Sequence, residues 1–300
     1  MDTTALEPLI QATQPQGGFA QPIGWIALLL YSTGTFIVIR RLFFNPPNPT
    51  LSTNSNTILK AFLHSPKAQL LLPGTAAVIL HLISSSSALF DASGFNFGAL
   101  PLLSLISALM IVATLCISLQ RPFENITLIV YPVAAVLLLT SNVFGSHYAP
   151  RADLSTPILC HIVFSIAAYC ILGIAFAQAL LLLGQNYQLK HKHLAGMINV
   201  LPPLQLMETI LFGLIWLGVI LLSLSIATGL LYFENFFAQK LVHKTFFTIG
   251  AWLMFTTLLI GRYYAGWRGI TAIRWMIGGF IFLALGVIGT KIVLEFILTS

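Results

Sequence analysis

Residues 158–183 read ILCHIVFSIAAYCILGIAFAQALLLL, and this stretch decides the class of the fold. It runs for 26 residues without a single Asp, Glu, Lys or Arg. A helix that crosses about 30 Å of hydrocarbon needs roughly 20 apolar residues, because each residue advances the helix by about 1.5 Å. The stretch therefore predicts a transmembrane helix, with His161 near its beginning.

The rest of the chain has the same character. Hydrophobic residues make up 57% of the 300 residues, charged residues 7%, and the mean hydropathy is +0.92. A soluble domain uses about a quarter charged residues, and the long continuous runs are unlike the alternating strands of a β-barrel. We expect an all-α integral membrane protein, a single membrane domain that is a bundle of about eight transmembrane helices. The predicted spans are residues 22–39, 70–90, 99–119, 126–143, 158–183, 208–233, 246–260 and 275–296, with a polar inner loop at 45–67.

The distribution of Lys and Arg predicts the orientation in the membrane. If the N-terminus is outside, ten of the fourteen Lys and Arg residues fall on the inner side of the predicted spans. The net charge of +6 therefore indicates positive-inside topology rather than a nucleic-acid partner. We expect both ends of the chain outside, and an inner aromatic belt of Tyr263, Tyr264, Trp267 and Trp275. The first 21 residues lack the basic segment of a signal peptide, so the first span should be retained.

Two histidines open spans at the outer side. His161 begins the fifth span and His243 the seventh, and the outward basic residues Arg151, Lys240 and Lys244 lie near them in sequence. Neutral imidazoles on neighbouring helices can hold haem iron axially, and the basic residues would then face its propionates or another anion. In the other interpretation the histidines are ordinary interfacial residues and the lysines extend to water. The spacing leaves both interpretations open.

Two further ionisable residues lie within or beside spans. His81 lies about mid-membrane in the second span, where a histidine needs a hydrogen-bond partner. It is either an internal haem ligand or a buried histidine bonded to a serine, and Ser84 lies one turn away. Glu208 begins the sixth span on the inner side. It either pairs with an inner arginine or forms a core ion pair that locks spans six and eight.

The sequence carries no catalytic constellation. GxSxG, HExxH, Walker and GxGxxG motifs are absent, and the three cysteines form no CxxC. These absences argue against a hydrolytic enzyme and against a thiol-disulfide or zinc role, and we predict no catalytic residues. No internal repeat or broken helix is evident, which disfavours a solute transporter.

Several short motifs together carry a family resemblance. In chain order they are His161-Ile-Val-Phe-Ser-Ile-Ala-Ala-Tyr169, Pro203-Leu-Gln-Leu-Met-Glu208, His243-Lys-Thr245, Trp252 and Gly266-Trp-Arg-Gly269. This set resembles the cytochrome c assembly protein family (CcsA-like), a group of haem-handling membrane proteins. It is most similar to the shorter, eight-span YpjD/HemX-like branch. The resemblance implies haem as cofactor, bound through histidines on the outer side, and a multi-pass protein of the bacterial inner membrane.

One departure from the family pattern narrows the expected function. Full CcsA-like proteins carry a tryptophan-rich outer loop, the WWD motif, whereas residues 232–243 here read YFENFFAQKLVH without a tryptophan. The resemblance thus implies a protein that binds or handles haem in cytochrome c biogenesis. Its expected partners are the lipid bilayer and other proteins of cytochrome c maturation or haem biosynthesis. The alternative is a HemX-like regulator or accessory protein of haem biosynthesis without haem ligase activity.

Overall fold

The structure is a computed structural model that describes residues 20–44, 66–91, 94–144, 155–191, 201–232 and 239–292. Within these ranges, eight helices are long and apolar enough to cross a membrane, which confirms the predicted all-α membrane fold. The helices are α2 (Ala20–Phe43), α4 (Pro66–Leu89), α5 (Ala99–Gln120), α6 (Thr127–Phe144), α7 (Thr156–Lys190), α9 (Leu204–Tyr232), α10 (Gln239–Tyr264) and α11 (Gly269–Ile292). Of the predicted polar loop 45–67, residues 66 and 67 belong to α4 and the remainder lies outside the described ranges.

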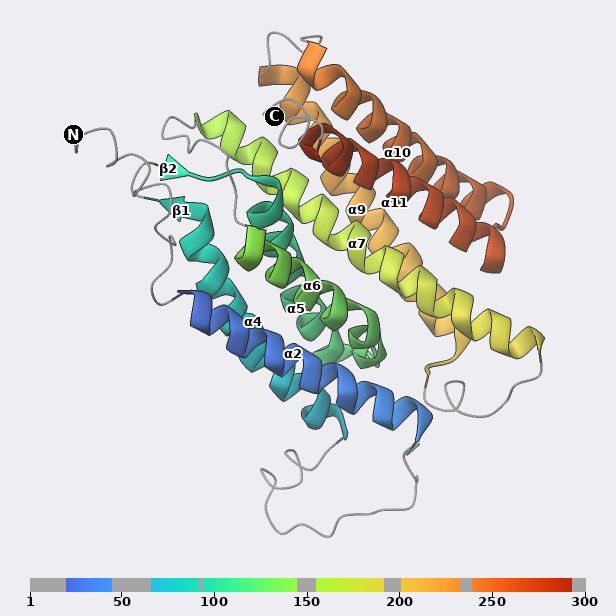
Figure 1. The fold of residues 1–300 in the computed structure, drawn as a ribbon. Coiled ribbons are helices and arrows are strands. Elements are labelled where there is room, and N and C mark those ends of the chain that lie inside the picture. The colour runs from blue at the N-terminus through green and yellow to red at the C-terminus, as the bar shows by residue number, and fades with distance from the viewer. Residues whose placement is uncertain are drawn as a thin grey trace, which may run out of the picture.

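The eight helices form two groups of four (Figure 1). In the first group α2 packs on α4 and α6, and α5 closes the ring by packing on the same two helices. In the second group α7 packs on α9 and α11, and α10 closes the ring in the same way. The order of neighbours is therefore the same in both groups, although the sequence shows no repeat. Contacts of α7 with α5 join the two groups.

Helix α7 runs along the junction of the two groups (Figure 1). It has 35 residues, a length of about 52 Å at about 1.5 Å per residue. Its first turn contains Pro157, which fits a position where the backbone N–H has no partner inside the helix. Because about 30 Å of hydrocarbon separates the two interfaces, α7 is long enough to reach beyond the membrane.

A tyrosine of α6 fills the centre of the first group. Tyr131 is fully buried, and two glycines make room for its ring. A Cβ atom at Gly34 of α2 would lie 2.9 Å from the ring of Tyr131, and a Cβ atom at Gly74 of α4 would overlap its hydroxyl oxygen. The absence of side chains at these two positions lets α2, α4 and α6 approach one another around a single aromatic ring.

Small residues on the second group have the same effect. A Cβ atom at Gly218 of α9 would lie 2.5 Å from the side chain of Leu172, so α7 and α9 approach closely there. On α7, Gly173 faces the side chain of Met110 from α5. Buried apolar side chains from both groups belong to one continuous core.

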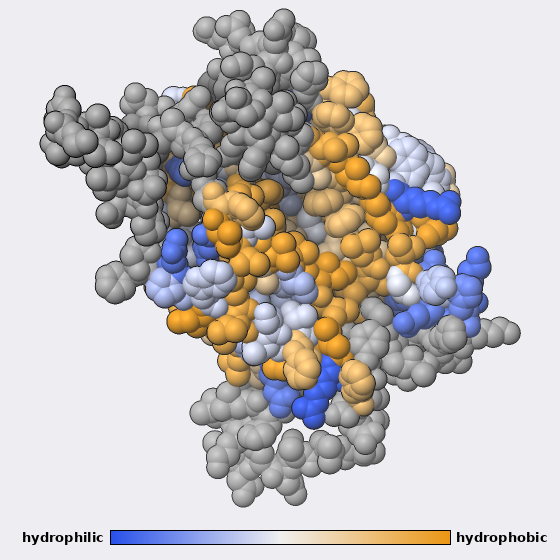
Figure 2. Space-filling view, in the orientation of Figure 1, coloured by the Kyte–Doolittle hydropathy of each residue, from blue (hydrophilic) through white to orange (hydrophobic). Residues whose placement is uncertain are grey.

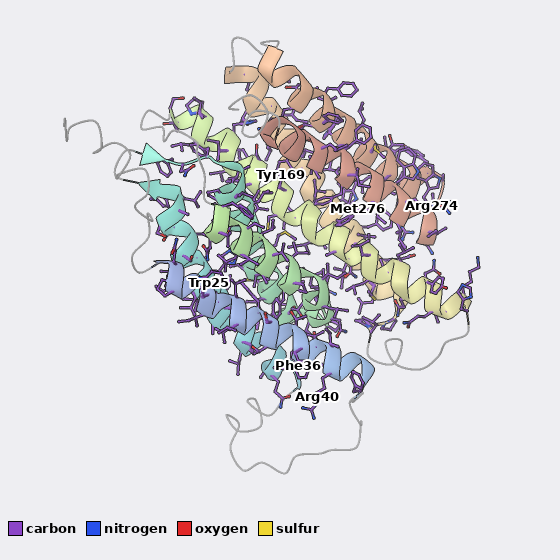
Figure 3. All side chains as sticks on the ribbon, in the orientation of Figure 1. Trp25, Phe36, Arg40, Tyr169, Arg274 and Met276 are labelled. Carbon is purple, nitrogen blue, oxygen red and sulfur yellow. The ribbon has the colours of Figure 1, made fainter. Side chains whose placement is uncertain are left out.

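The surface is that of a lipid-solvated protein. The visible face is largely hydrophobic, with hydrophilic residues gathered towards its ends (Figure 2). Along α2, Trp25 and Phe36 are 47% and 64% exposed, and Arg40 lies near the end of the same helix that the distribution of Lys and Arg predicts to be inner (Figure 3). Outer and inner hereafter refer to these predicted sides of the membrane. A short hairpin, β1 (Phe90–Asp91) with β2 (Gly94–Phe95), connects α4 to α5 on the outer side.

Candidate functional site

His161 lies near the outer end of α7, half-buried against α9. Its Nδ1 atom is 2.8 Å from the backbone carbonyl oxygen of Ser225. A carbonyl oxygen only accepts hydrogen bonds, so Nδ1 must carry the proton and donate it. In the neutral imidazole, Nε2 then holds the lone pair. Histidines that bind metals commonly have this arrangement, with one ring nitrogen donating to a carbonyl and the other binding the metal.

A pair of serines fixes the helices that carry this contact. The Ser165 hydroxyl donates to the carbonyl oxygen of His161 at 2.7 Å, and its oxygen lies 2.7 Å from the hydroxyl of Ser225. Because Ser165 has only one hydroxyl proton, Ser225 supplies the proton of the second bond. The two serines therefore join α7 to α9 at the level of His161, and they hold the Ser225 carbonyl against the imidazole.

The second outer histidine lies on the opposite corner of the same helical ring. His243 is in the second turn of α10, which packs on α9 and α11, the same two helices that flank α7. Helix α10 follows the end of α9, which carries Ser225, so the beginning of α10 lies at the same end of the ring as His161. The residue after His243, Lys244, is exposed at this end. The side chains of His243 and Lys240, and the whole of Arg151, lie outside the described part of the chain.

Two aromatic residues of the sequence motifs connect the same four helices. The indole Nε1–H of Trp252 on α10 donates to the hydroxyl of Ser223 on α9 at 2.8 Å. The hydroxyl of Tyr169 on α7 points at the carbonyl oxygen of Leu283 on α11, at a long 3.5 Å. Both bonds satisfy polar groups inside the bundle, where no water competes.

His81 lies in the first group and is fully buried. Its Nδ1 atom is 3.2 Å from the hydroxyl of Tyr31 on α2, and its Nε2 atom is 2.9 Å from the hydroxyl of Ser104 on α5. Ser104 also contacts the hydroxyl of Ser85 at 3.1 Å. Hydroxyl groups both donate and accept, so either neutral tautomer of the imidazole is satisfied. The serine partner is on a neighbouring helix and is not Ser84, and the structure does not bring His81 together with His161.

Glu208 lies at the inner end of the second group and is buried. Its Oε1 atom accepts a hydrogen bond of 2.8 Å from the backbone N–H of Gly269, the first residue of α11. In the described part of the chain, no arginine forms an ion pair with this carboxylate. Glu208 therefore does connect spans six and eight, but through a backbone donor. Gly269 has a φ of 55°, a left-handed conformation that favours glycine.

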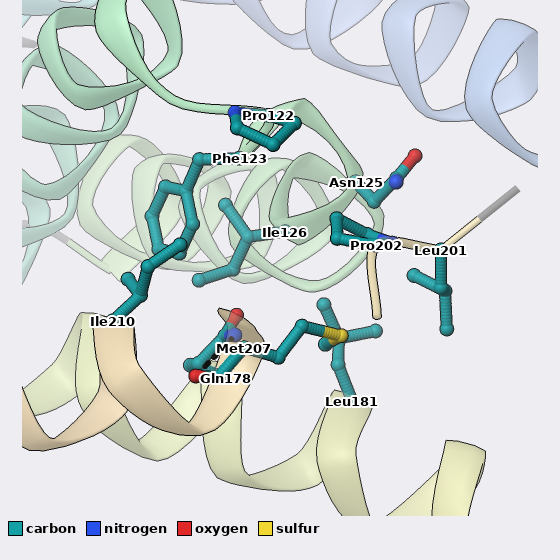
Figure 4. Close-up of a pocket in the computed structure, with 10 residues that line it drawn as sticks. All are labelled: Pro122, Phe123, Asn125, Ile126, Gln178, Leu181, Leu201, Pro202, Met207 and Ile210. Atoms are coloured by element: carbon teal, nitrogen blue, oxygen red, sulfur yellow. Dashed lines mark hydrogen bonds between the residues drawn. The ribbon is translucent and has the colours of Figure 1, made fainter. Parts of the chain in front are cut away.

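A small pocket lies at the inner end of the junction between the two groups (Figure 4). Apolar side chains such as Phe123, Ile126 and Leu181 form most of its wall, together with the amides of Asn125 and Gln178. The Gln178 amide donates to the carbonyl oxygen of Met207 at 3.2 Å, which joins α7 to the beginning of α9. The space is comparable to one water molecule and does not accept a cofactor.

Comparison with known proteins assigns the family. The sequence model described as Cytochrome C assembly protein matches residues 70–298. The chain belongs to the cytochrome c assembly protein family. This match confirms the resemblance carried by the motifs, and it covers seven of the eight spanning helices. The family region contains His81, His161, Glu208 and His243. It excludes α2, so the bond from Tyr31 to His81 attaches a helix outside the family match to a residue within it.

Two relatives share parts of this sequence. The inner membrane protein YpjD of Escherichia coli K12 is 33% identical over 230 residues, which cover 76% of this chain and 87% of YpjD. An uncharacterized 28.8 kDa protein of Azospirillum brasilense is 28% identical over 140 residues, 46% of this chain and 52% of its own. No solved structure gives a significant match. This member of the cytochrome c assembly family is a multi-pass protein of the inner membrane.

The sequence did not reveal the groups that hold the candidate residues. For His161 the partner is a backbone carbonyl 64 residues away, and for His81 the partners come from α2 and α5. One of the supporting contacts had a signal in the sequence. Ser165 follows His161 by four residues, which places both residues on the same face of α7.

Proposed function

We propose that the outer end of the second helical group binds haem, with His161 as an axial ligand through Nε2. The observation that carries this proposal is the bond from His161 Nδ1 to the Ser225 carbonyl oxygen. It sets the tautomer that a ligating histidine requires and fixes the orientation of the ring. Bound haem would supply the iron chemistry, and the chain would supply ligation and orientation.

His243 is the candidate for the second axial ligand. It belongs to the helix diagonally across the ring from α7, at the same end of the group. The adjacent Lys244 is exposed at this end of the group, and we propose that its positive charge compensates a haem propionate. Lys240 and Arg151 are proposed as further propionate contacts because they flank the same two histidines in sequence.

His81 is a third candidate ligand, but its hydrogen bonds oppose iron binding. Both of its ring nitrogens already have hydrogen-bond partners. Ligation of iron at His81 would require the loss of the bond to Tyr31 or to Ser104, in a site that is fully buried. The outer pair of histidines therefore comes first in the proposal.

The visible spectrum of the purified protein tests haem binding. The protein is prepared from haem-replete cells as the parent, as His161→Ala and as His191→Ala. His191 is the matched control, because it is an exposed histidine at the inner end of the same helix. We expect bis-histidine Soret and α/β bands in the parent and in His191→Ala, and their loss in His161→Ala. A parent protein that stays colourless after haem is added would refute the proposal.

A second candidate function is regulation of haem biosynthesis without attachment of haem. The absence of tryptophan from residues 232–243 favours it, since the WWD motif is the part of CcsA-like proteins that presents haem. Deletion of the gene then changes the levels of haem precursors while c-type cytochromes remain normal. A parallel loss of c-type cytochromes supports a role in their maturation instead.

A further inference from the structure

The inner end of the second group carries a cluster of arginines and aromatic residues that the proposed haem site does not use. We name residues 262–274, the end of α10, the loop after it and the beginning of α11, the inner corner. Arg268 and Arg274 are exposed, and Arg274 lies at the edge of the molecule on α11 (Figure 3). Tyr263 and Tyr264 are 83% and 82% exposed, more than any other large hydrophobic or aromatic side chain in the described part of the chain.

The inner corner makes several contacts with α9 and within its own loop. The guanidinium of Arg262 lies 4.6 Å from the centre of the Phe212 ring on α9, and it donates to the carbonyl oxygen of Trp267 at 3.3 Å. The ring of Trp267 stacks on Trp275 with centroids 5.4 Å apart. These contacts anchor the loop on both sides, so Arg268 and Arg274 are presented from a fixed backbone.

The positive charge of the inner corner exceeds the negative charge near it. Of the eight acidic residues of the chain, only Glu124 and Glu208 lie on the predicted inner side. Glu124 belongs to the first group, where it begins the short helix Glu124–Ile126 that precedes α6. Glu208 is beside the inner corner, but it is buried and its Oε1 atom accepts from Gly269. Among the residues that the structure describes, no carboxylate forms an ion pair with Arg262, Arg268 or Arg274, so the cluster keeps a net positive charge.

We propose that the inner corner binds the headgroup of an anionic phospholipid, with Arg268 and Arg274 at the phosphate and Tyr263 and Tyr264 at headgroup level. Arginines on the cytoplasmic side of spanning helices attract anionic lipids, and tyrosines are enriched at this depth. A lipid fits better than a soluble anion or a protein because apolar residues on α11 continue from the cluster into the membrane. Ile270 and Ile281 are 39% and 49% exposed there.

Lipid binding to the full-length protein tests this proposal. Native mass spectrometry measures the affinity for dioleoylphosphatidylglycerol and for dioleoylphosphatidylcholine, in the parent and in Arg268→Gln/Arg274→Gln. Each arginine near an anionic surface contributes about 1 kcal/mol, so the double variant should bind phosphatidylglycerol about 30-fold more weakly. Phosphatidylcholine should bind weakly to both proteins, and inorganic phosphate should not displace the anionic lipid.

A matched control separates a site from a general effect of charge. Arg40→Gln/Arg121→Gln removes two exposed arginines from the inner ends of α2 and α5, in the other helical group. We expect this variant to keep the affinity of the parent. An equal loss in both double variants, no loss in Arg268→Gln/Arg274→Gln, or displacement by inorganic phosphate would overturn the proposal. The result is independent of whether the outer end binds haem.

Discussion

Replacement of Ser104 by alanine tests the buried polar network of the first helical group. The Ser104 side chain is 1% exposed, and its hydroxyl contacts His81 Nε2 at 2.9 Å and Ser85 Oγ at 3.1 Å. In the described part of the chain, Ser104 is the hydrogen-bond partner of that nitrogen. Ser104→Ala removes one oxygen atom and leaves a polar ring nitrogen facing an apolar methyl group.

The expected destabilisation follows from two limits. A buried polar group without a partner costs about 1–3 kcal/mol. Hydrogen bonds between spanning helices contribute less, about 0.6 kcal/mol on average and about 1.7 at most, because the unfolded chain in the membrane also finds partners. Since His81 is fully buried and its other nitrogen remains bonded to Tyr31, we expect Ser104→Ala to lower the free energy of unfolding by about 1–2 kcal/mol.

A double-mutant cycle in bicelles measures this contribution. Unfolding is followed for the parent, Ser104→Ala, His81→Leu and the double variant. The two side chains are in contact, so the coupling energy should be at least about 0.5 kcal/mol. Ser86→Ala is the matched control, because Ser86 is exposed and its hydroxyl bonds to Ile83 of its own helix; we expect a change within about 0.5 kcal/mol.

The reasoning would be refuted by additive effects of the two substitutions, with a coupling within about 0.3 kcal/mol of zero. It would also be refuted if Ser86→Ala destabilised the protein as much as Ser104→Ala. A coupling near zero would show that the contact between His81 and Ser104 does not stabilise the first group, whereas an equal loss in Ser86→Ala would show that the effect is not specific to a buried serine.

Two further predictions concern the contacts that set helix positions. Gly74→Ala should lower the free energy of unfolding by about 1–3 kcal/mol, because its methyl group overlaps the Tyr131 hydroxyl. Adding Tyr131→Phe to this variant should recover part of the loss. An unchanged free energy of unfolding in Gly74→Ala would contradict this packing. Glu208→Met leaves the Gly269 N–H without its acceptor and should lower the free energy of unfolding by about 1–3 kcal/mol. Glu208→Gln keeps an acceptor oxygen and should lower it less, so equal losses measured in the same assay would argue against this bond.

The candidate residues of the site could be predicted from the sequence, but their hydrogen-bond partners could not. The rarity of ionisable residues within the spans singled out His161, His81 and Glu208. Their partners could not be anticipated, because they are backbone groups or serines on other helices. Any of the many serines in the chain could have been the partner of His81, and the nearest in sequence, Ser84, is not the one that bonds to it.

The sequence by itself determined the class of the fold and the family. Spanning helices depend on local apolar runs of roughly 20 residues, and these are readable without knowledge of any neighbour. Only the tertiary structure decided that the helices form two four-membered rings, that Ser225 orients His161 and that Glu208 bonds to Gly269. In a membrane all exposed faces are apolar, so hydrophobicity does not select helix partners. The fit of residues such as Gly74 against Tyr131 does, and it joins segments that are far apart in the chain.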